Sequence, residues 1–217
     1  MILAAGRGNR MRPLTDNTPK PLLEINGKPL IQYQIEKLVS AGVKDIVINH
    51  AIMGDQIEAC FGDGRQLGAN ITYSAEGNMP LETGGGIFQA LPYLGSAPFI
   101  AINADIWTDY PYQDLPNTLT GLAHLILVNN PHHNPHGDFA IADGYICNNG
   151  TVRYTFSGIG VYSHELFRHC SNRAFPLAPL IRRAAEGRQV TAALYQGVWI
   201  DIGTPERLQE LSKSISK

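Results

Sequence analysis

The sequence predicts a single α/β domain, with a Rossmann-like, mostly parallel sheet, helices on both faces and a small antiparallel lid. Strand-like and helix-like segments alternate through the first half of the chain, an order typical of parallel sheets. The second half contains strand-like segments joined by short glycine turns. The 217 residues, 44% of them hydrophobic, can bury one substantial core, and no linker or repeat divides them. We therefore expect one domain over residues 1–217.

The expected elements of the first half follow from hydrophobic periodicity. Short apolar runs predict strands at 1–3, 45–50, 70–75 and 98–105. Amphipathic spacing predicts helices at 30–40, 55–61 and 83–91. Gly42 closes the first of these helices.

The second half is less regular. A strand is expected at 122–128, followed by a polar loop broken by prolines. Residues 139–162 predict antiparallel strands, with turns at Asp143-Gly144 and Asn148-Asn149-Gly150. The remaining expected elements are helices at 163–169 and 177–186, strands at 191–196 and 198–202, and a final helix from Thr204.

Composition excludes several classes of protein. The net charge is −2 and the 17 basic residues are spread along the chain, so we expect no nucleic-acid partner and no membrane-surface patch. No apolar run approaches the roughly 18–20 residues that span a bilayer. The three cysteines are widely separated, which favours free thiols in a reducing compartment. We expect a cytoplasmic protein.

The opening stretch MILAAGRGNRMRPLT does not fit the two common phosphate motifs. The dinucleotide fingerprint needs a third glycine where Met11 stands, and no P-loop pattern occurs in the chain. A bare G-x-G is weak evidence, because tight turns use glycine for backbone reasons alone.

The stretch is better interpreted as another kind of triphosphate-binding turn. Small residues at its start would let a base and ribose lie against bare backbone, and Gly8 would let amides converge on phosphate oxygens. Arg10 offers a planar fork, and Lys20, held between two prolines, a compact charge. Each arginine alone could equally be a solvated surface charge. The expected nucleotide-binding residues here are Leu3, Ala4, Ala5, Gly6, Arg7, Gly8, Arg10 and Lys20.

The segments LAAGRGNRMRPLT and TPKPL together resemble the signature of sugar-phosphate nucleotidyltransferases. The resemblance implies transfer of a nucleotidyl group from a nucleoside triphosphate to a sugar 1-phosphate, with Arg10 and Lys20 on the phosphates. Further segments resemble a bacterial branch of the family that recycles cell-wall sugars; they include GVKDIVINHA, PLETGGGI and TFSGIGVY. A non-catalytic sensor of nucleotide sugars, or a transferase for another sugar 1-phosphate, remains an alternative.

Two aspartates supply the expected acidic half of the site. Asp105 ends a strand, at the sheet edge where α/β folds bind ligands, and Asp201 follows an apolar strand. Either could be a simple turn or cap residue. The resemblance assigns both to one Mg²⁺, although Ala104 replaces a glycine that is common in the family. The expected catalytic residues are then Arg10, Lys20 and Asp105.

The loop after the strand at 70–75 lies where the family reads the base. Glu76 or a neighbouring carbonyl can accept the N3–H of uracil or thymine, which favours UTP, with thymidine as the nearest rival. Gly77, Pro80 and Gly84 are expected to keep the backbone close to the nucleotide. Thr83 and the glycine run are expected to open a helix toward it.

For the sugar, Asn103 emerges on the same side of its strand as Asp105. Asp138 opens a strand, and the resemblance places Ser157 and Gly158 over the sugar. His132, His133 and His136 lie within five residues, but their Pro/Asn loop favours a solvated segment over a metal site. No Ser–His or Cys–His pair is needed, because a phosphate monoester with a second pKa of about 6 is already mostly ionised.

Overall fold

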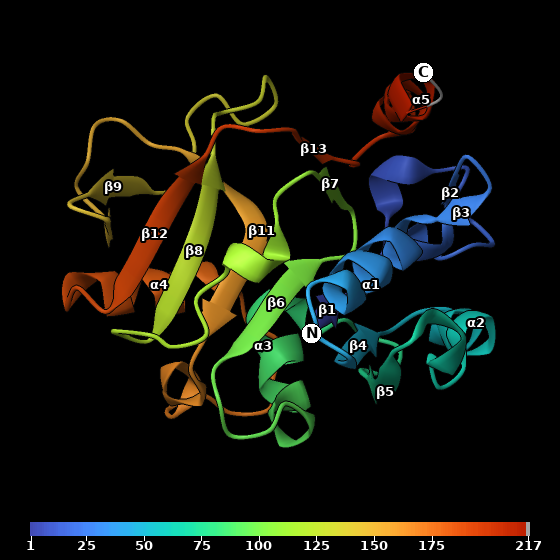
Figure 1. Cartoon of the computed structure of the whole chain (residues 1–217), viewed down its shortest axis with the longest axis horizontal. Coiled ribbons are helices and arrows are strands. Elements are labelled where there is room, and N and C mark those ends of the chain that lie inside the picture. The colour runs from blue at the N-terminus through green and yellow to red at the C-terminus, as the bar shows by residue number, and fades with distance from the viewer. Residues whose placement is uncertain (216–217) are drawn as a thin grey trace.

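A nine-stranded sheet is the central element of the computed structural model, which describes residues 1–215 (Figure 1). From edge to edge its strands are β5 (Asn70–Ala75), β4 (Asp45–His50), β1 (Ile2–Leu3), β6 (Phe99–Asn103), β11 (Thr155–Tyr162), β8 (Ala123–Val128), β12 (Val190–Tyr195), β10 (Tyr145–Cys147) and β9 (Ala140–Ala142). Seven of the nine strands run in one direction, because only β10 and β11 pair antiparallel with both neighbours. The predicted α/β fold with a mostly parallel sheet is confirmed.

Helices cover both faces of this sheet. They are α1 (Leu30–Ser40) and α2 (Gly54–Phe61) on one face, and α3 (Glu82–Ala90) and α4 (Ala178–Glu186) on the other. Successive side chains of β4 point to opposite faces of the sheet. Ile48 packs with α1 and α2, whereas Val47 packs with α3 and α4. Burial on both faces explains why the strands are almost uniformly apolar.

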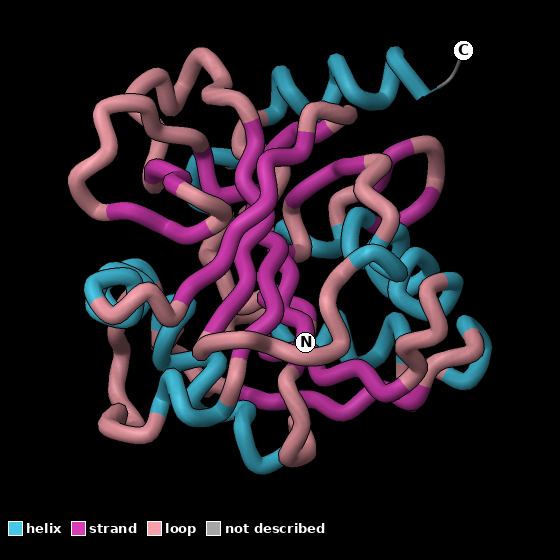
Figure 2. The backbone as a smooth tube through the Cα atoms, turned by 60° about the vertical axis from the view of Figure 1, so that its left-hand side comes forward, coloured by secondary structure: helices cyan, strands magenta, loops and turns pink. Residues whose placement is uncertain are grey.

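Two small antiparallel sheets lie beside the main one. The first is a hairpin of β2 (Glu24–Ile25) and β3 (Lys28–Pro29), and the second pairs β7 (Ile106–Thr108) with β13 (Trp199–Asp201). The final helix α5 (Pro205–Ile215) lies across the hairpin, along the top of the molecule (Figures 1 and 2). Met11 and Leu211, both buried, join helix, hairpin and β13 in a third apolar cluster. This cluster fixes the C-terminal helix against the opening loop.

The structure differs from the sequence expectations in three places. The helix expected at 163–169 is only a short 3-10 helix, His164–Phe167. The hairpin around Asn26-Gly27 and strand β7 were not predicted. Strands β9 to β11 continue the main sheet itself, so the antiparallel layer beside it consists of the two small sheets. Within residues 1–215, no helix is both long and apolar enough to cross a membrane.

Candidate active site

Two adjoining cavities lie at the edge of the sheet where β1 and β6 end. The first, of about 240 Å³, is lined by Leu3, Ala4, Ala5, Gly6, Lys20, Pro21, Asn49, Pro80, Glu82, Thr83, Asn103, Ala104 and Asp105. The second, of about 310 Å³, is lined by Gly6, Arg7, Gly8, Asn9, Arg10, Met11, Lys20, Asp105 and Gly203. Gly6, Lys20 and Asp105 belong to both. The residues expected from the opening stretch therefore line these cavities together with Asp105.

The opening turn is built by close packing around Gly8. Gly8 has a φ of +63°, and a Cβ there would lie 3.1 Å from the Cβ of Lys20 and from the Cγ2 of Thr15. The hydroxyl of Thr15 donates to the carbonyl of Gly8 at 2.9 Å. Glycine is required because the backbone is left-handed and the lysine stem lies directly against it. The turn thus holds Lys20 at the floor of the site.

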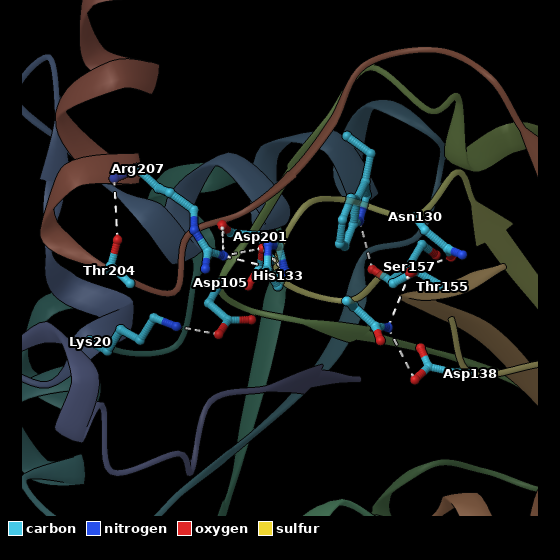
Figure 3. Close-up of polar contacts among 12 residues, drawn as sticks. Lys20, Asp105, Asn130, His133, Asp138, Thr155, Ser157, Asp201, Thr204 and Arg207 are labelled. Atoms are coloured by element: carbon cyan, nitrogen blue, oxygen red, sulfur yellow. Dashed lines mark hydrogen bonds and ion pairs between the residues drawn. The ribbon is translucent and has the colours of Figure 1, made fainter. Parts of the chain in front are cut away.

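Lys20 and Asp105 form an ion pair between the two cavities (Figure 3). The lysine side chain is only 10% exposed, whereas that of Asp105 is 35% exposed. A buried ammonium requires a nearby anion, because an unpaired charge away from water is costly. The lysine contacts Oδ2 of the carboxylate. The other oxygen, Oδ1, is left for a further ligand.

Strand pairing brings Asp201 next to Asp105. Asp201 pairs with Ile106 across β13 and β7, and the next amide, of Ile202, donates to the carbonyl of Asp105 at 2.8 Å. The Asp201 side chain, 21% exposed, accepts from Arg207, and its Oδ1 lies 2.9 Å from Nε2 of His133 (Figure 3). Both contacts fall on Oδ1.

Oδ2 of Asp201 lies beside Gly203 on the wall of the second cavity, although Asp201 itself is not one of the lining residues. A Cβ added at Gly203 would lie 3.0 Å from Oδ2 of Asp201 and 3.4 Å from Nη1 of Arg10. Gly203 lines the cavity that also holds Arg10, Lys20 and Asp105. Two half-buried carboxylates, each keeping one oxygen for a further ligand, form a hard-oxygen donor set that suits a divalent cation shared with phosphates. The side chains present therefore fit a metal ion held by Asp105 and Asp201.

A hydrogen-bonded chain of side chains supports the loop that follows β5. Asn49 accepts from the amide of Ala4 at 2.9 Å and donates to Oε1 of Glu76 at 2.6 Å. Oε2 of Glu76 accepts from the amide of Leu81 at 2.6 Å. Burial of the Glu76 carboxylate raises its pKa, partly offset by these hydrogen bonds. Glu76 is thus committed to holding the loop 76–81 against β4.

The predicted role of the glycine run is corrected by its packing. A Cβ at Gly84 would lie 2.5 Å from the ring of Phe175, and the amides of Gly84 and Gly85 both donate to the carbonyl of Phe175. The 173–175 segment therefore covers the glycines Gly84 and Gly85 of this helix start. Within the described residues, Glu76, Gly77 and Gly84 lie outside the lining of both cavities, whereas Glu82 and Thr83 line the first.

Of the four residues predicted for the sugar, Asn103 and Gly158 lie together. Gly158 has a φ of +79°, and a Cβ there would lie 2.6 Å from Nδ2 of Asn103, which lines the first cavity. Ser157 is wrong as a ligand contact, because it is 1% exposed and its hydroxyl donates to the carbonyl of Ile126. Asp138 accepts from Asn134 and from the amide of Phe156, so its carboxylate braces the loop before β9 (Figure 3).

The comparison with known proteins agrees with this geometry. Residues 1–142, about two thirds of the chain, match the family model described as nucleotidyl transferase. The chain belongs to the nucleotidyl transferase family. It is 48% identical, over 97% of its length and 95% of the relative's, to N-acetylmuramate alpha-1-phosphate uridylyltransferase of Neisseria meningitidis serogroup B. The protein of that name from Caulobacter vibrioides is 31% identical over 95% of this chain and 92% of its own.

Among solved structures, that of HddC from Yersinia pseudotuberculosis superimposes on this nucleotidyl transferase with a TM-score of 0.81. The superposition covers 99% of this chain and 97% of the other, at 25% sequence identity. The cavities at the carboxyl edge are thus set in a fold shared along the whole chain.

Sequence reasoning missed three groups that shape the site of this nucleotidyl transferase. His133, expected in a solvated loop, contacts Asp201, although it is exposed like His132 and His136. Within residues 1–215, no group of three or more acidic, histidine or cysteine side chains is arranged to hold a metal ion. Asn49, a buried amide at the end of an apolar strand, was the one recognisable signal. The sequence around Arg207 contains no such signal, because only the packing of α5 brings Arg207 to Asp201.

Proposed function

We propose that this nucleotidyl transferase transfers a uridylyl group from UTP to N-acetylmuramate α-1-phosphate, forming UDP-N-acetylmuramate and pyrophosphate in peptidoglycan recycling. The observation that carries the proposal is the 48% identity to a protein of that activity over 97% of the chain. A second relative of the same name also matches over nearly the full length. Cys60, Cys147 and Cys170 are unpaired, which supports a cytoplasmic location.

In this reaction an oxygen of the sugar phosphate forms a bond to the α-phosphorus of UTP, and the bond from that phosphorus to the β-phosphate oxygen breaks. No proton needs to be removed, since the attacking phosphate is largely dianionic at neutral pH. The obstacle is to align two polyanions and to neutralise charge in the transition state. Cations on rigid backbone are suited to both tasks.

The residues around the two cavities divide these tasks. The amides at Gly8 and the guanidinium of Arg10, which line the second cavity, are proposed to bind the departing β- and γ-phosphates. Lys20, which lines both cavities, is proposed to bind the α-phosphate or the incoming sugar phosphate. Asp105 and Asp201 would hold Mg²⁺, which would supply neutralising charge to the phosphate oxygens.

The first cavity is proposed to receive the nucleoside and the sugar. Leu3, Ala4 and Ala5 leave backbone exposed for the ribose and base, and Pro80 and Thr83 form the opposite wall. Since Glu76 is engaged with Asn49 and Leu81, backbone groups near Pro80 are the better candidates for the uracil N3–H. Asn103, resting on Gly158, is proposed to bind a sugar hydroxyl.

The lactyl carboxylate of N-acetylmuramate calls for a cation, and the sequence offers Lys28, Arg153 and Arg182. Lys28 is already paired with Glu36 at 2.7 Å. Arg182 donates to the carbonyl of Asp138, and Arg153 donates to that of Asn148. Because these two arginines contact neutral carbonyls and not a carboxylate, they are the better candidates.

A pyrophosphate-release assay tests the proposal. UTP, dTTP, GTP and CTP would each be paired with the 1-phosphates of N-acetylmuramate, N-acetylglucosamine, glucose and mannose, with and without Mg²⁺. We expect release with UTP and N-acetylmuramate 1-phosphate, dependent on Mg²⁺. Efficient release with another pair would assign another sugar or base, and no release with any pair would favour a nucleotide-sugar sensor.

A further inference from the structure

Arg207 forms an ion pair with Asp201, one of the two aspartates of the site. It stands in the first turn of α5, and its Nη1 contacts both Oδ1 and, at 3.2 Å, the backbone carbonyl of Asp201. Its side chain is 21% exposed, and its amide donates to the hydroxyl of Thr204. The helix that carries it is anchored by Leu211, which is buried against Met11 of the opening loop. The contacts with Asp201 and the anchoring of α5 therefore fix the position of this arginine.

The two aspartates share a charge pattern. Asp105 is paired with Lys20, and Asp201 is paired with Arg207 (Figure 3). A partly buried carboxylate is stabilised by a nearby counter-charge, and each of the two has its own cation in contact. One of these cations, Lys20, is also placed to bind phosphate.

Arg207 lies at the border of the same cavity as the other phosphate-binding cations. A Cβ at Gly203 would lie 3.1 Å from Nη1 of Arg207 and 3.4 Å from Nη1 of Arg10. Gly203 lines the second cavity, so both guanidinium groups approach one point on its wall. Arg10, Lys20 and Arg207 are three cations beside two carboxylates, and Arg7 also lines the cavity. This leaves an excess of positive charge at a cavity suited to a polyphosphate.

We propose that Arg207 is the counter-cation of Asp201 in the metal-free protein and becomes a third polyphosphate-binding cation when a divalent ion binds Asp201. Arginine suits this exchange because its fork binds carboxylate and phosphate in the same geometry. The inference rests on the proposed phosphate chemistry of the site, but on neither the base nor the sugar.

The proposal predicts two opposite effects of removing the charge. A divalent ion and Arg207 compete for the same carboxylate and repel one another, so Arg207→Gln should strengthen the binding of the ion alone. A polyphosphate loses one cation, so the same variant should bind it more weakly. A residue that only positioned Asp201 would weaken the binding of the ion as well.

The experiment uses Mn²⁺ alone and inorganic pyrophosphate as probes. The free Mn²⁺ signal in electron paramagnetic resonance would be titrated with wild type and Arg207→Gln, and we expect at least about fivefold tighter binding by the variant. Calorimetric titration with pyrophosphate at saturating Mn²⁺ should show about tenfold weaker binding, or about 1.4 kcal/mol. Unchanged or weaker Mn²⁺ binding would overturn the counter-cation role, and unchanged pyrophosphate binding would overturn the phosphate role.

Lys213→Gln is the matched control, because Lys213 is exposed on the same helix and its loss changes the net charge equally. It should change neither titration. If Arg207→Gln does not fold, Arg207→Lys keeps the charge but loses the fork, and should shift both affinities in the same directions by smaller factors. Neither probe contains uridine or sugar, so failure of the proposed function would leave these results unaffected.

Discussion

Lys20 and Asp105, separated by 85 positions in the sequence, form an ion pair on the shared wall of the two cavities. One of the two is nearly buried, and the other keeps an oxygen available to the cavity. The pair therefore connects the phosphate-binding turn after β1 with the strand end of β6. The positive and negative charges of the site are therefore in position before any substrate binds.

Asp105→Asn is expected to lower kcat by about 100-fold or more, because the amide neither neutralises a divalent ion nor attracts it. The fold should persist, since an amide oxygen can still accept from Lys20. Steady-state kinetics and thermal unfolding would measure the two effects. Asp143→Asn, in an exposed turn, is the control for loss of one carboxylate. An Asp105→Asn enzyme with near-normal kcat would remove the metal assignment.

Ser157→Ala should act on stability and not on substrate. The buried hydroxyl donates to the carbonyl of Ile126 and accepts from the amide of Ile159, so its loss should lower the free energy of unfolding by about 1–3 kcal/mol. Urea denaturation would measure this, and the KM for the sugar 1-phosphate should not change. Asn103→Ala, in contrast, should raise that KM. A raised KM in Ser157→Ala would restore the serine to the sugar site.

Gly85→Ala is expected to destabilise the protein by about 1–3 kcal/mol, because the added Cβ would lie 2.3 Å from the backbone carbonyl of Arg173. Backbone cannot move away as a flexible side chain can. Gly187→Ala, where the nearest atom is 3.6 Å away, is the control. Equal unfolding midpoints in urea for the two variants would contradict the close packing of α3 on the 173–175 segment.

Much of the fold was predictable because it depends on local pattern. The apolar runs of β4, β5 and β6 alternate with helical segments along the chain, and this order predicted a mostly parallel sheet. The periodicity of residues 30–40 predicted α1 at its observed bounds. The hairpin around Asn26-Gly27 carries an equally local signal: both residues have positive φ, as the Asn-Gly turn favours. Its strands are only two residues long, which is too short for periodicity to detect.

The errors at the site have a different cause, since they depend on how distant segments meet. The register of β11 shifts between Phe156 and Ile159, so a simple alternation does not predict that Ser157 points into the core. Gly84 meets Phe175 only because the segment before α4 crosses the start of α3. Arg207 reaches Asp201 through the packing of α5 on the opening loop. None of these contacts is encoded within a single segment.

The contact between Gly158 and Asn103 yields the last prediction. Gly158→Ala would combine a left-handed backbone, costing about 1–2 kcal/mol, with a Cβ 2.6 Å from the Asn103 amide. Gly144→Ala has nearly the same φ, +77° against +79°, but no atom within 4 Å of the new Cβ, so it reproduces the backbone cost alone. We expect both variants to lose stability in urea, and only Gly158→Ala to raise the KM for the sugar 1-phosphate, because only there is the asparagine displaced from the cavity wall. The same kinetic constants in both variants would show that Asn103 does not contact the sugar.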